Sequence, residues 1–264
     1  MESVEQEWIE SPDGWGTNEK CRASVDGCES IDLFGNDDPT EYYTFTVHID
    51  DNTAKTLRLQ GFKLDSEETV RSTGVTLWQA APRLATFLQN HPEACRGKSV
   101  LELGAGLGLC GIVAYFLGAQ SVMMTDGDTH TLHQMRANVH RCTTTPTTDS
   151  NHITCRQLLW GSPHMETFAQ HGKYDTILGA DVVYTQDSIP PLLDTVACLL
   201  KKPHGQFVLS RFSKWNNVDD EIVIEAALLR YLACTRPSKG IFIFRWDEIL
   251  LHRAPSSLSQ FDSC

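Results

Sequence analysis

The sequence contains a glycine-rich turn of the kind that receives nucleotides and nucleosides. An apolar run, Ser99–Leu103, leads into the turn at Gly104–Gly108, and a helical pattern begins at Leu109. Glycines let ligand atoms approach the backbone closely, and the first amides of the following helix are free to donate hydrogen bonds. Leu109 stands where a dinucleotide fingerprint would have its last glycine. A pyrophosphate-containing cofactor such as NAD is therefore disfavoured.

Two carboxylates accompany this turn. Glu102 lies at the end of the strand before it, where its negative charge suits a ligand with a positive charge. Asp126 follows the next predicted strand, Ser121–Thr125, 22 residues after Gly104. An acidic side chain at that place can accept hydrogen bonds from both hydroxyls of a ribose. Together, the turn and the carboxylates predict an adenosine-type cofactor that has a ribose and no pyrophosphate.

Alternating strands and helices must position these residues. Such alternation predicts βαβ units and a mostly parallel, doubly wound α/β sheet, which binds ligands at the carboxyl ends of its strands. Asp181-Val-Val-Tyr184 follows one of these strands, so we expect it at the mouth of the site. The predicted central strands are Ser99–Leu103, Ser121–Thr125, Ile153–Leu158, Thr176–Ala180 and Gln206–Ser210, with closing strands at Gly240–Trp246 and Ile249–His252. The predicted helices are Trp78–Leu88, Leu109–Leu117, Thr129–His140, Ile189–Leu200 and Asp219–Leu232.

The first quarter of the chain differs from the rest in charge. The 264 residues carry a formal net charge of −12, and residues 1–74 alone hold 17 acidic and 6 basic side chains. We therefore expect an acidic, flexible arm at residues 1–41, followed by one domain at 42–264 that includes a β-hairpin at about 43–64. Because no basic stripe is visible, nucleic acid is not expected as a partner.

Other features of the composition concern location and metals. No run approaches the 18 apolar residues of a membrane span, and the first residues do not resemble a secretory signal. Nine cysteines without a CxxC pair indicate a reducing compartment. His130 and His133 lack a third nearby ligand, so no metal is expected. The predicted location is the cytoplasm, with the nucleus as a second possibility, and we expect a monomer.

Several motifs together resemble a known family. Residues 102–108 with Thr125-Asp126 resemble the first motif and acidic partner of seven-β-strand, S-adenosylmethionine-dependent (class I, Rossmann-like) methyltransferases. Three further segments are similar to the methyltransferase-21-like (family 16) protein-lysine methyltransferases: residues 74–81, 159–161 and 174–184. The hallmark of that family, (Asp/Glu)-x-x-Tyr, corresponds to Asp181–Tyr184. The resemblance runs from about Tyr42 to His252. Residues 211–217 do not clearly match the region expected after the fifth strand, and residues 143–150 are expected to form an extended loop; both could line the substrate side.

The resemblance implies S-adenosylmethionine as the cofactor and a role for each matched residue. Asp126 would bind the ribose, Trp160 would line the adenine pocket and Trp78 would lie near the sulfonium. Gly104, Ala105 and Gly106 would contact the amino-acid part of the cofactor, and Ala180 would lie behind it. Asp181 would accept a hydrogen bond from a substrate amine, and Tyr184 would offer its hydroxyl or ring to the cationic product.

A protein lysine is the acceptor that this resemblance favours. An amine must be neutral to attack a methyl group, and for a lysine this costs about 4 kcal/mol near neutral pH. Asp181 suits such a basic amine, whereas nucleic-acid amino-methyltransferases carry an Asn-Pro-Pro-Tyr type motif. The alternatives are a protein histidine, an N-terminal amine or a small molecule as acceptor, or a non-catalytic scaffold that uses the acidic arm for protein contacts. The identity of the substrate protein is not predicted.

Overall fold

The computed structural model describes residues 38–50, 52–143, 153–161, 165–170, 172–212 and 218–253. Most of the predicted acidic arm, residues 144–150 and residues 213–217 lie outside these ranges, so the predictions made for them remain predictions. A compact unit begins at Pro39.

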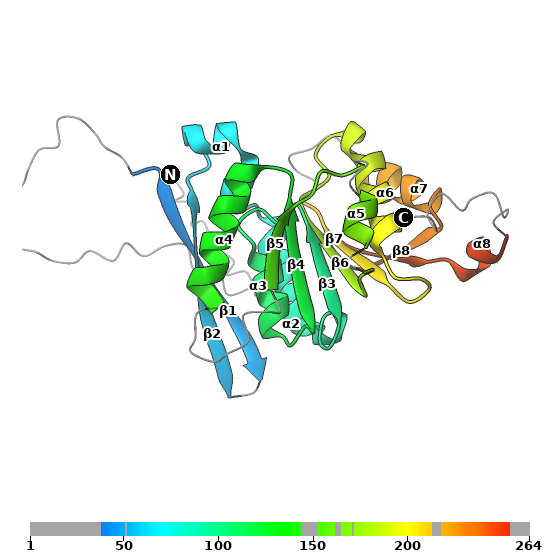
Figure 1. The fold of residues 1–264 in the computed structure, drawn as a ribbon, viewed down its shortest axis with the longest axis horizontal. Helices are drawn as coiled ribbons and strands as arrows, with labels where there is room; N and C mark the ends of the chain where they lie inside the picture. Colours follow the sequence, from blue (N-terminus) through cyan, green and yellow to red (C-terminus); the bar gives the residue numbers. More distant parts are fainter. Residues whose placement is uncertain are drawn as a thin grey trace, which may run out of the picture. The chain divides into compact units, whose positions relative to one another are not determined.

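A seven-stranded sheet forms the centre of this unit, in the order β5-β4-β3-β6-β7-β9-β8 (Figure 1). The neighbouring strands from β5 to β7 pair in parallel, and β9 is antiparallel to both β7 and β8. This confirms the predicted doubly wound, mostly parallel α/β sheet. The strands are β3 (Ser99–Leu103), β4 (Ser121–Asp126), β5 (Ile153–Gln157), β6 (Thr176–Ala180), β7 (Gln206–Ser210), β8 (Leu232–Ser238) and β9 (Ile241–Trp246).

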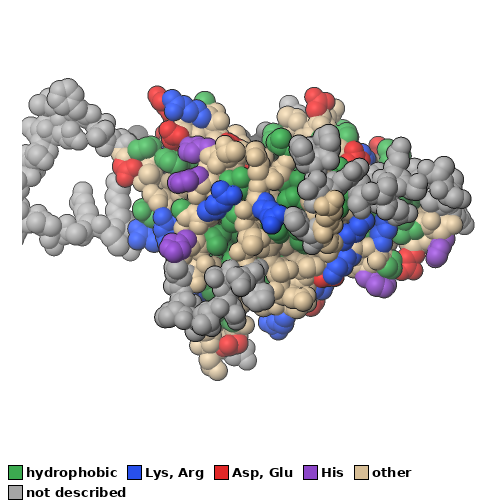
Figure 2. All heavy atoms as spheres, in the orientation of Figure 1, with side chains coloured by type: hydrophobic (Ala, Val, Ile, Leu, Met, Phe, Trp, Pro, Cys, Tyr) green, Lys and Arg blue, Asp and Glu red, His purple; other side chains and the backbone are tan. Residues whose placement is uncertain are grey.

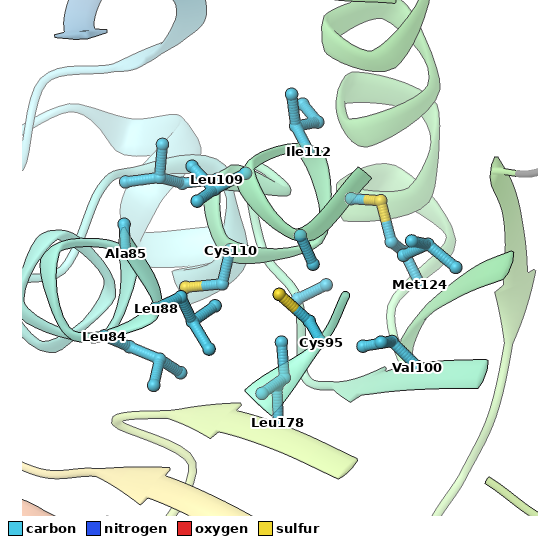
Figure 3. Close-up of a cluster of buried hydrophobic side chains, with 14 of the residues drawn as sticks. Leu84, Ala85, Leu88, Cys95, Val100, Leu109, Cys110, Ile112, Met124 and Leu178 are labelled. Atoms are coloured by element: carbon cyan, nitrogen blue, oxygen red, sulfur yellow. The ribbon is translucent and has the colours of Figure 1, made fainter. Parts of the chain in front are cut away.

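Helices cover both faces of the sheet. Buried residues of α2, α3 and α4 pack in one apolar cluster with one face of the sheet, and those of α6 and α7 pack in a second cluster with the other. Figure 3 shows α2 and α3 meeting the sheet through Leu84, Leu88, Cys110 and Leu178. The helical segments are α1 (Glu67–Arg71), η1 (Thr73–Val75), α2 (Ala80–Asn90), η2 (Pro92–Ala94), α3 (Leu109–Phe116), α4 (Thr129–Thr143), α5 (Met165–Ala169), η4 (Gln186–Ser188), α6 (Ile189–Leu199), α7 (Asp220–Leu228) and α8 (Glu248–Arg253).

The predicted N-terminal hairpin is present as β1 (Thr40–Asp50) and β2 (Thr53–Phe62). Its apolar side chains, which alternate along each strand, belong to the same buried cluster as α2, α3 and α4. The buried Asn138 of α4 connects the hairpin to the glycine turn. Its amide exchanges hydrogen bonds of 2.9 Å with the backbone of Gln60 and also donates to the Leu107 carbonyl at 3.2 Å.

One predicted closing strand is wrong. Residues Ile249–His252 belong to α8 instead of a strand. The Asp247 carboxylate accepts hydrogen bonds from the backbone N–H groups of Ile249 and Leu250, at 3.0 and 3.1 Å. An aspartate that satisfies the first amides in this way favours a helix start, and this local signal outweighs the apolar character of the segment.

The true seventh strand is β8, which the sequence pattern did not predict. The helix before it was predicted to reach Leu232, but α7 ends at Leu228 and Leu232 begins the strand. β8 contains Pro237 and a mostly exposed second half. Proline is tolerated at the edge of a sheet, so β8 exists through its pairing with β9 and carries little strand signal of its own.

Within the described ranges, none of the helices is both long enough and apolar enough to span a bilayer.

Candidate active site

The glycine turn after β3 has the backbone that its composition predicts. Gly104, Gly106 and Gly108 adopt left-handed conformations with φ of +60°, +54° and +90°. A Cβ atom on Gly104 would lie 2.8 Å from Val182 Cγ1 and 3.3 Å from Trp160 Cζ2, and one on Gly106 would lie 3.2 Å from the Gly74 carbonyl oxygen. A side chain at Gly104 would therefore collide with Val182, and one at Gly106 would crowd the Gly74 carbonyl.

Asp126 holds this turn from the end of β4. One carboxylate oxygen accepts the Gly106 N–H at 3.1 Å, and the other accepts the Asp128 N–H at 3.1 Å. Burial raises the pKa of the Asp126 carboxyl, although these two N–H groups act in the opposite direction. Each carboxylate oxygen keeps a second lone pair, so the side chain can still accept hydrogen bonds from a ribose.

Glu102, unlike Asp126, is directed to the helix that follows the glycine turn. Its side chain is buried, and one oxygen accepts the Gly111 N–H in the first turn of α3 at 2.8 Å. Burial raises the pKa of this carboxyl to about 8. What the structure shows is a carboxyl that fixes the helix after the turn; direct contact of Glu102 with a cofactor remains a prediction. The neighbouring Cys110 thiol is also buried, and burial raises its pKa, so its place near a helix start does not activate it.

Asp181 follows β6 directly and is held in an unusual conformation. Its φ is +56°, a value that non-glycine residues rarely adopt, and its N–H donates to the Ser210 carbonyl at 2.9 Å. One carboxylate oxygen accepts the Phe212 N–H at 3.1 Å. Burial raises the pKa of the Asp181 carboxyl against the opposing influence of that N–H, Arg211 and Arg83.

The rest of the Asp181–Tyr184 motif lies between the turn and the surface. Val182 is the residue whose side chain approaches Gly104, so the motif packs directly against the glycine turn. Tyr184 is 60% exposed, and Leu159, which precedes Trp160, is 57% exposed. Both side chains are therefore accessible from the solvent.

The remaining predicted site residues lie around the same turn. The Trp160 ring is half-buried and contacts the Gly104 position, and Ala180 ends β6 immediately before Asp181. Ala105 is buried in the turn, and its N–H donates to the Thr125 carbonyl at 2.8 Å. Trp78 is half-buried, and its indole N–H donates to the Thr73 carbonyl at 2.8 Å, which links it to the segment that covers Gly106.

Two groups of residues near the site carried no recognisable sequence signal. Ser72 and Thr131 join their hydroxyls at 2.8 Å and hold the segment η1 over the turn. Arg83 and Phe212 contact the residues around Asp181. In the described part of the chain, no three His, Cys, Asp or Glu side chains gather in a way that could hold a metal.

Comparison with solved structures supports the fold. A SAM-dependent methyltransferase from Agrobacterium tumefaciens superposes with a TM-score of 0.52 at 16% identity, over 78% of this chain and 70% of that one.

Comparison of sequences identifies the family. The chain is 38% identical over 141 residues to protein N-lysine methyltransferase METTL21A of Danio rerio, a match that covers 53% of this chain and 62% of the relative. It is 36% identical over 134 residues to EEF1A lysine methyltransferase 3 of Mus musculus, covering 51% and 53%. The matches thus span between half and two thirds of these relatives. A family model described as lysine methyltransferase matches residues 59–225, which is more than half of the sequence. The chain belongs to this lysine methyltransferase family.

Proposed function

We propose that this protein is an S-adenosylmethionine-dependent methyltransferase that modifies the ε-amino group of a lysine on another protein. The observation that carries the proposal is the contact between its two key motifs: Val182 of the Asp181–Tyr184 segment packs on Gly104 of the glycine turn. The group that would receive the substrate amine is therefore fixed beside the turn that would hold the methyl donor.

S-adenosylmethionine is the cofactor that the family and the fold indicate, and the residues present fit it. The glycine turn provides a surface on which no Cβ atom intrudes at Gly104 or Gly106, Asp126 provides acceptor oxygens, and the Trp160 ring provides an aromatic face. When bound, the cofactor supplies an electrophilic methyl group on a positively charged sulfur.

The chain's own residues would orient the nucleophile. Asp181 can accept a hydrogen bond from an amine through the carboxylate oxygen that Phe212 leaves free. Orientation of two reacting groups can supply roughly 7–11 kcal/mol of the barrier reduction. The exposed ring of Tyr184 can contact the cationic methylated product.

A protein acceptor is supported by the relatives and by the surface. Both relatives are named as lysine methyltransferases, METTL21A as a protein N-lysine methyltransferase and the other as an EEF1A lysine methyltransferase. Tyr184, in the motif, and Leu159, next to Trp160, are both exposed, so a macromolecular substrate can reach them.

A methylation assay tests the reaction and its acceptor. The purified protein and isotope-labelled S-adenosylmethionine are added to lysate from cells that lack this gene, and the labelled sites are mapped by peptide mass spectrometry. We expect the label on lysine side chains. Label on histidine, on N-terminal amines or only on small molecules would replace the lysine assignment by one of those acceptors, and no label at all would contradict the enzyme assignment.

Calorimetry with S-adenosylhomocysteine tests the cofactor site separately. We expect Asp126→Ala to weaken binding by about tenfold or more, because the variant loses charge-assisted hydrogen bonds to a ribose. Asp65→Ala, at an exposed aspartate, is the control and should change affinity much less. Absence of binding by the folded wild-type protein would favour a scaffold role.

We further propose that the protein acts as a monomer on protein substrates, in the cytoplasm or in the cytoplasm and the nucleus. All six cysteines of the described residues are free thiols, which supports a reducing compartment.

On the face drawn in Figure 2, acidic and basic side chains are interspersed, in keeping with the 17 acidic and 16 basic residues of positions 75–264. Light scattering and cell fractionation test these two points.

A further inference from the structure

The carboxylate of Asp181 depends on a short segment that follows β7. The backbone N–H of Phe212 donates a hydrogen bond to this carboxylate, and the backbone N–H of Asp181 donates to the Ser210 carbonyl. A residue with a positive φ keeps that conformation only when its surroundings enforce it. The geometry of Asp181 therefore depends on what holds residues 210–212.

Arg83 of α2 holds this segment from one side. Its Nη1 donates to the Arg211 carbonyl oxygen at 2.7 Å, and its guanidinium lies 5.0 Å from the centre of the Phe212 ring. Gly240 makes room for this contact. A Cβ atom there would collide with Arg83 Nη1 and would lie 2.7 Å from the Arg211 carbonyl oxygen.

The Arg211 side chain holds the same segment from the other side. It is 2% exposed, forms an ion pair with Asp220 of α7 and donates to the Val218 carbonyl at 2.9 Å. The Arg211 N–H donates to the Gly240 carbonyl at 2.9 Å. Arg211 is thus held at three places: its side chain, its N–H and its carbonyl. Arg83 provides the contact to the carbonyl.

We propose that Arg83 is a positioning residue for methyl transfer: by fixing the Arg211 carbonyl and the Phe212 ring, it sets the Phe212 N–H that orients the Asp181 carboxylate. This inference rests on the proposed function. Arg83 acts through its neighbours and does not itself contact the reacting groups.

The charge of Arg83 has a second effect on Asp181. Burial raises the pKa of that carboxyl, whereas Arg211, at the end of β7, and Arg83, on α2, lower it. These are the charged groups that the described structure places near Asp181. Loss of the Arg83 charge should therefore raise the pKa of Asp181 and move the acidic limb of the pH–rate profile to higher pH.

Three variants test the proposal in the full-length protein: Arg83→Gln, Arg83→Lys and Arg96→Gln. Arg96 is the matched control, since its Nε also donates to a backbone carbonyl, that of Leu117, in a part of the fold away from Asp181. Initial rates of label transfer to the lysate, the apparent KM for S-adenosylmethionine and the affinity for S-adenosylhomocysteine are measured for each variant.

Arg83→Gln is expected to lower the apparent kcat by about tenfold to a hundredfold, because small misplacements of a reacting group have effects of this size. Its KM for the cofactor and its affinity for S-adenosylhomocysteine should stay within about twofold of wild type, which also shows that the variant is folded. Arg83→Lys keeps the charge without the planar fork, so it should restore the pH profile but only part of the rate. Arg96→Gln should behave as wild type.

Two results would overturn the inference. One is an unchanged kcat in Arg83→Gln while the wild type is active, and the other is a loss of cofactor affinity as large as the loss of kcat. An inactive wild type would instead count against the proposed function. In that case, the Asp181 carboxyl can be followed by ¹³C NMR, with Asp181→Asn to assign its signal: an unchanged pKa in Arg83→Gln would overturn the coupling between the two side chains.

Discussion

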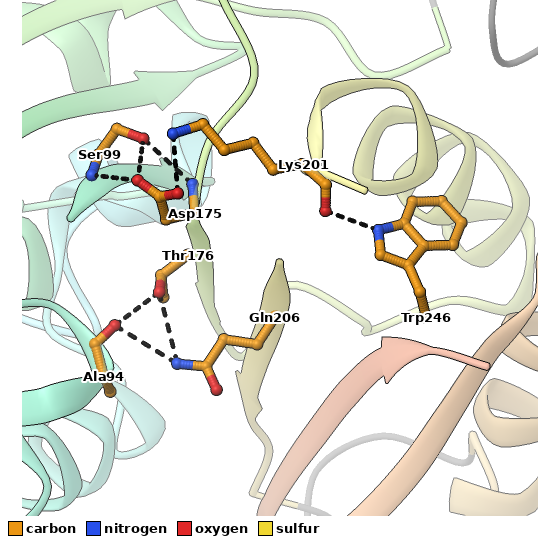
Figure 4. Close-up of polar contacts among 7 residues, drawn as sticks. All are labelled: Ala94, Ser99, Asp175, Thr176, Lys201, Gln206 and Trp246. Atoms are coloured by element: carbon orange, nitrogen blue, oxygen red, sulfur yellow. Dashed lines mark hydrogen bonds and ion pairs between the residues drawn. The ribbon is translucent and has the colours of Figure 1, made fainter. Parts of the chain in front are cut away.

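The two ends of the central sheet differ in how their carboxylates are stabilised. At the amino ends of β3 and β6, the Asp175 carboxylate accepts hydrogen bonds from the N–H and hydroxyl of Ser99, at 2.9 and 2.7 Å, and from Lys201 at 2.7 Å (Figure 4). Burial opposes ionisation of Asp175, but the hydrogen bonds from Lys201 and Ser99 outweigh it and lower the pKa of the carboxyl. Nearby, Thr176 donates to the Ala94 carbonyl at 2.5 Å.

At the opposite edge of the sheet, at the carboxyl ends of β4, β6 and β7, the polar groups are less well satisfied. Burial raises the pKa values of Asp126 and Asp181, and Asp181 also has a strained backbone. Among the described residues, the buried Ser210 hydroxyl and Arg211 Nε find no hydrogen-bond partner. Carboxylates with raised pKa values and strained residues collect at functional sites, which supports the proposal that the active site lies at this end of the sheet.

The largest effect is expected from Asp181→Asn. Asparagine tolerates a positive φ and can still accept the Phe212 N–H, so the variant removes little more than the charge. We expect the methyl-transfer rate to fall by about a hundredfold, within the range that a positioned acid–base group contributes, with cofactor affinity unchanged. Rate measurements and calorimetry check this.

The control for that variant is Asp187→Asn, at an exposed aspartate of η4 close in sequence. It should keep full activity. An equal loss of activity in both variants, or a loss of cofactor affinity in Asp181→Asn, would remove the distinction between binding and chemistry at this end of the sheet.

The corresponding change at the amino end, Asp175→Ala, should affect stability and leave the site intact. It leaves the partly buried N–H of Ser99 without its acceptor, which costs about 1 kcal/mol in the free energy of unfolding. Urea unfolding measures this change, and affinity for S-adenosylhomocysteine should not change. Asp65→Ala, at an exposed aspartate, is the control.

The pH dependence of Asp175→Ala follows from its lowered pKa. Stability that comes from a carboxylate with a lowered pKa is present above the unfolded pKa of about 4 and is lost as pH falls through the lower, folded pKa. The difference between wild type and variant should therefore shrink in acid. A difference that grows in acid would show that Asp175 is not held as the structure indicates.

A pH-dependent effect on stability is expected at Glu102, whose folded pKa is raised to about 8. Between the unfolded pKa, near 4.5, and the folded value, the folded protein keeps a proton that the unfolded chain has lost, so stability falls as pH rises. Glu102→Gln keeps an acceptor for the Gly111 N–H and removes this titration. Relative to wild type, the variant should gain roughly 1 kcal/mol per pH unit across that window.

Unfolding at several pH values between 5 and 8 measures the Glu102 effect, with exposed Glu93→Gln as the control. A constant difference between Glu102→Gln and wild type across this range would mean that Glu102 is ionised in the folded protein, as in a site that faces a cation.

The amino-acid sequence by itself determined the parts of the site that depend on local backbone rules. The glycines at 104, 106 and 108 indicate positive φ values, and alternating strands and helices place Asp126 and Asp181 at strand ends. These predictions need only a few neighbouring residues, which is why they could be made without the structure.

Only the tertiary structure decided which distant residues support that site. Arg83 lies 128 positions before the carbonyl that it contacts, and Asn138 lies 78 positions after its partner Gln60. The same holds for β8, which forms because β9 pairs with it, and for Glu102, whose carboxyl is directed to α3 by packing. Contacts between segments far apart in the chain arise from packing and leave no periodic pattern in the residues that make them.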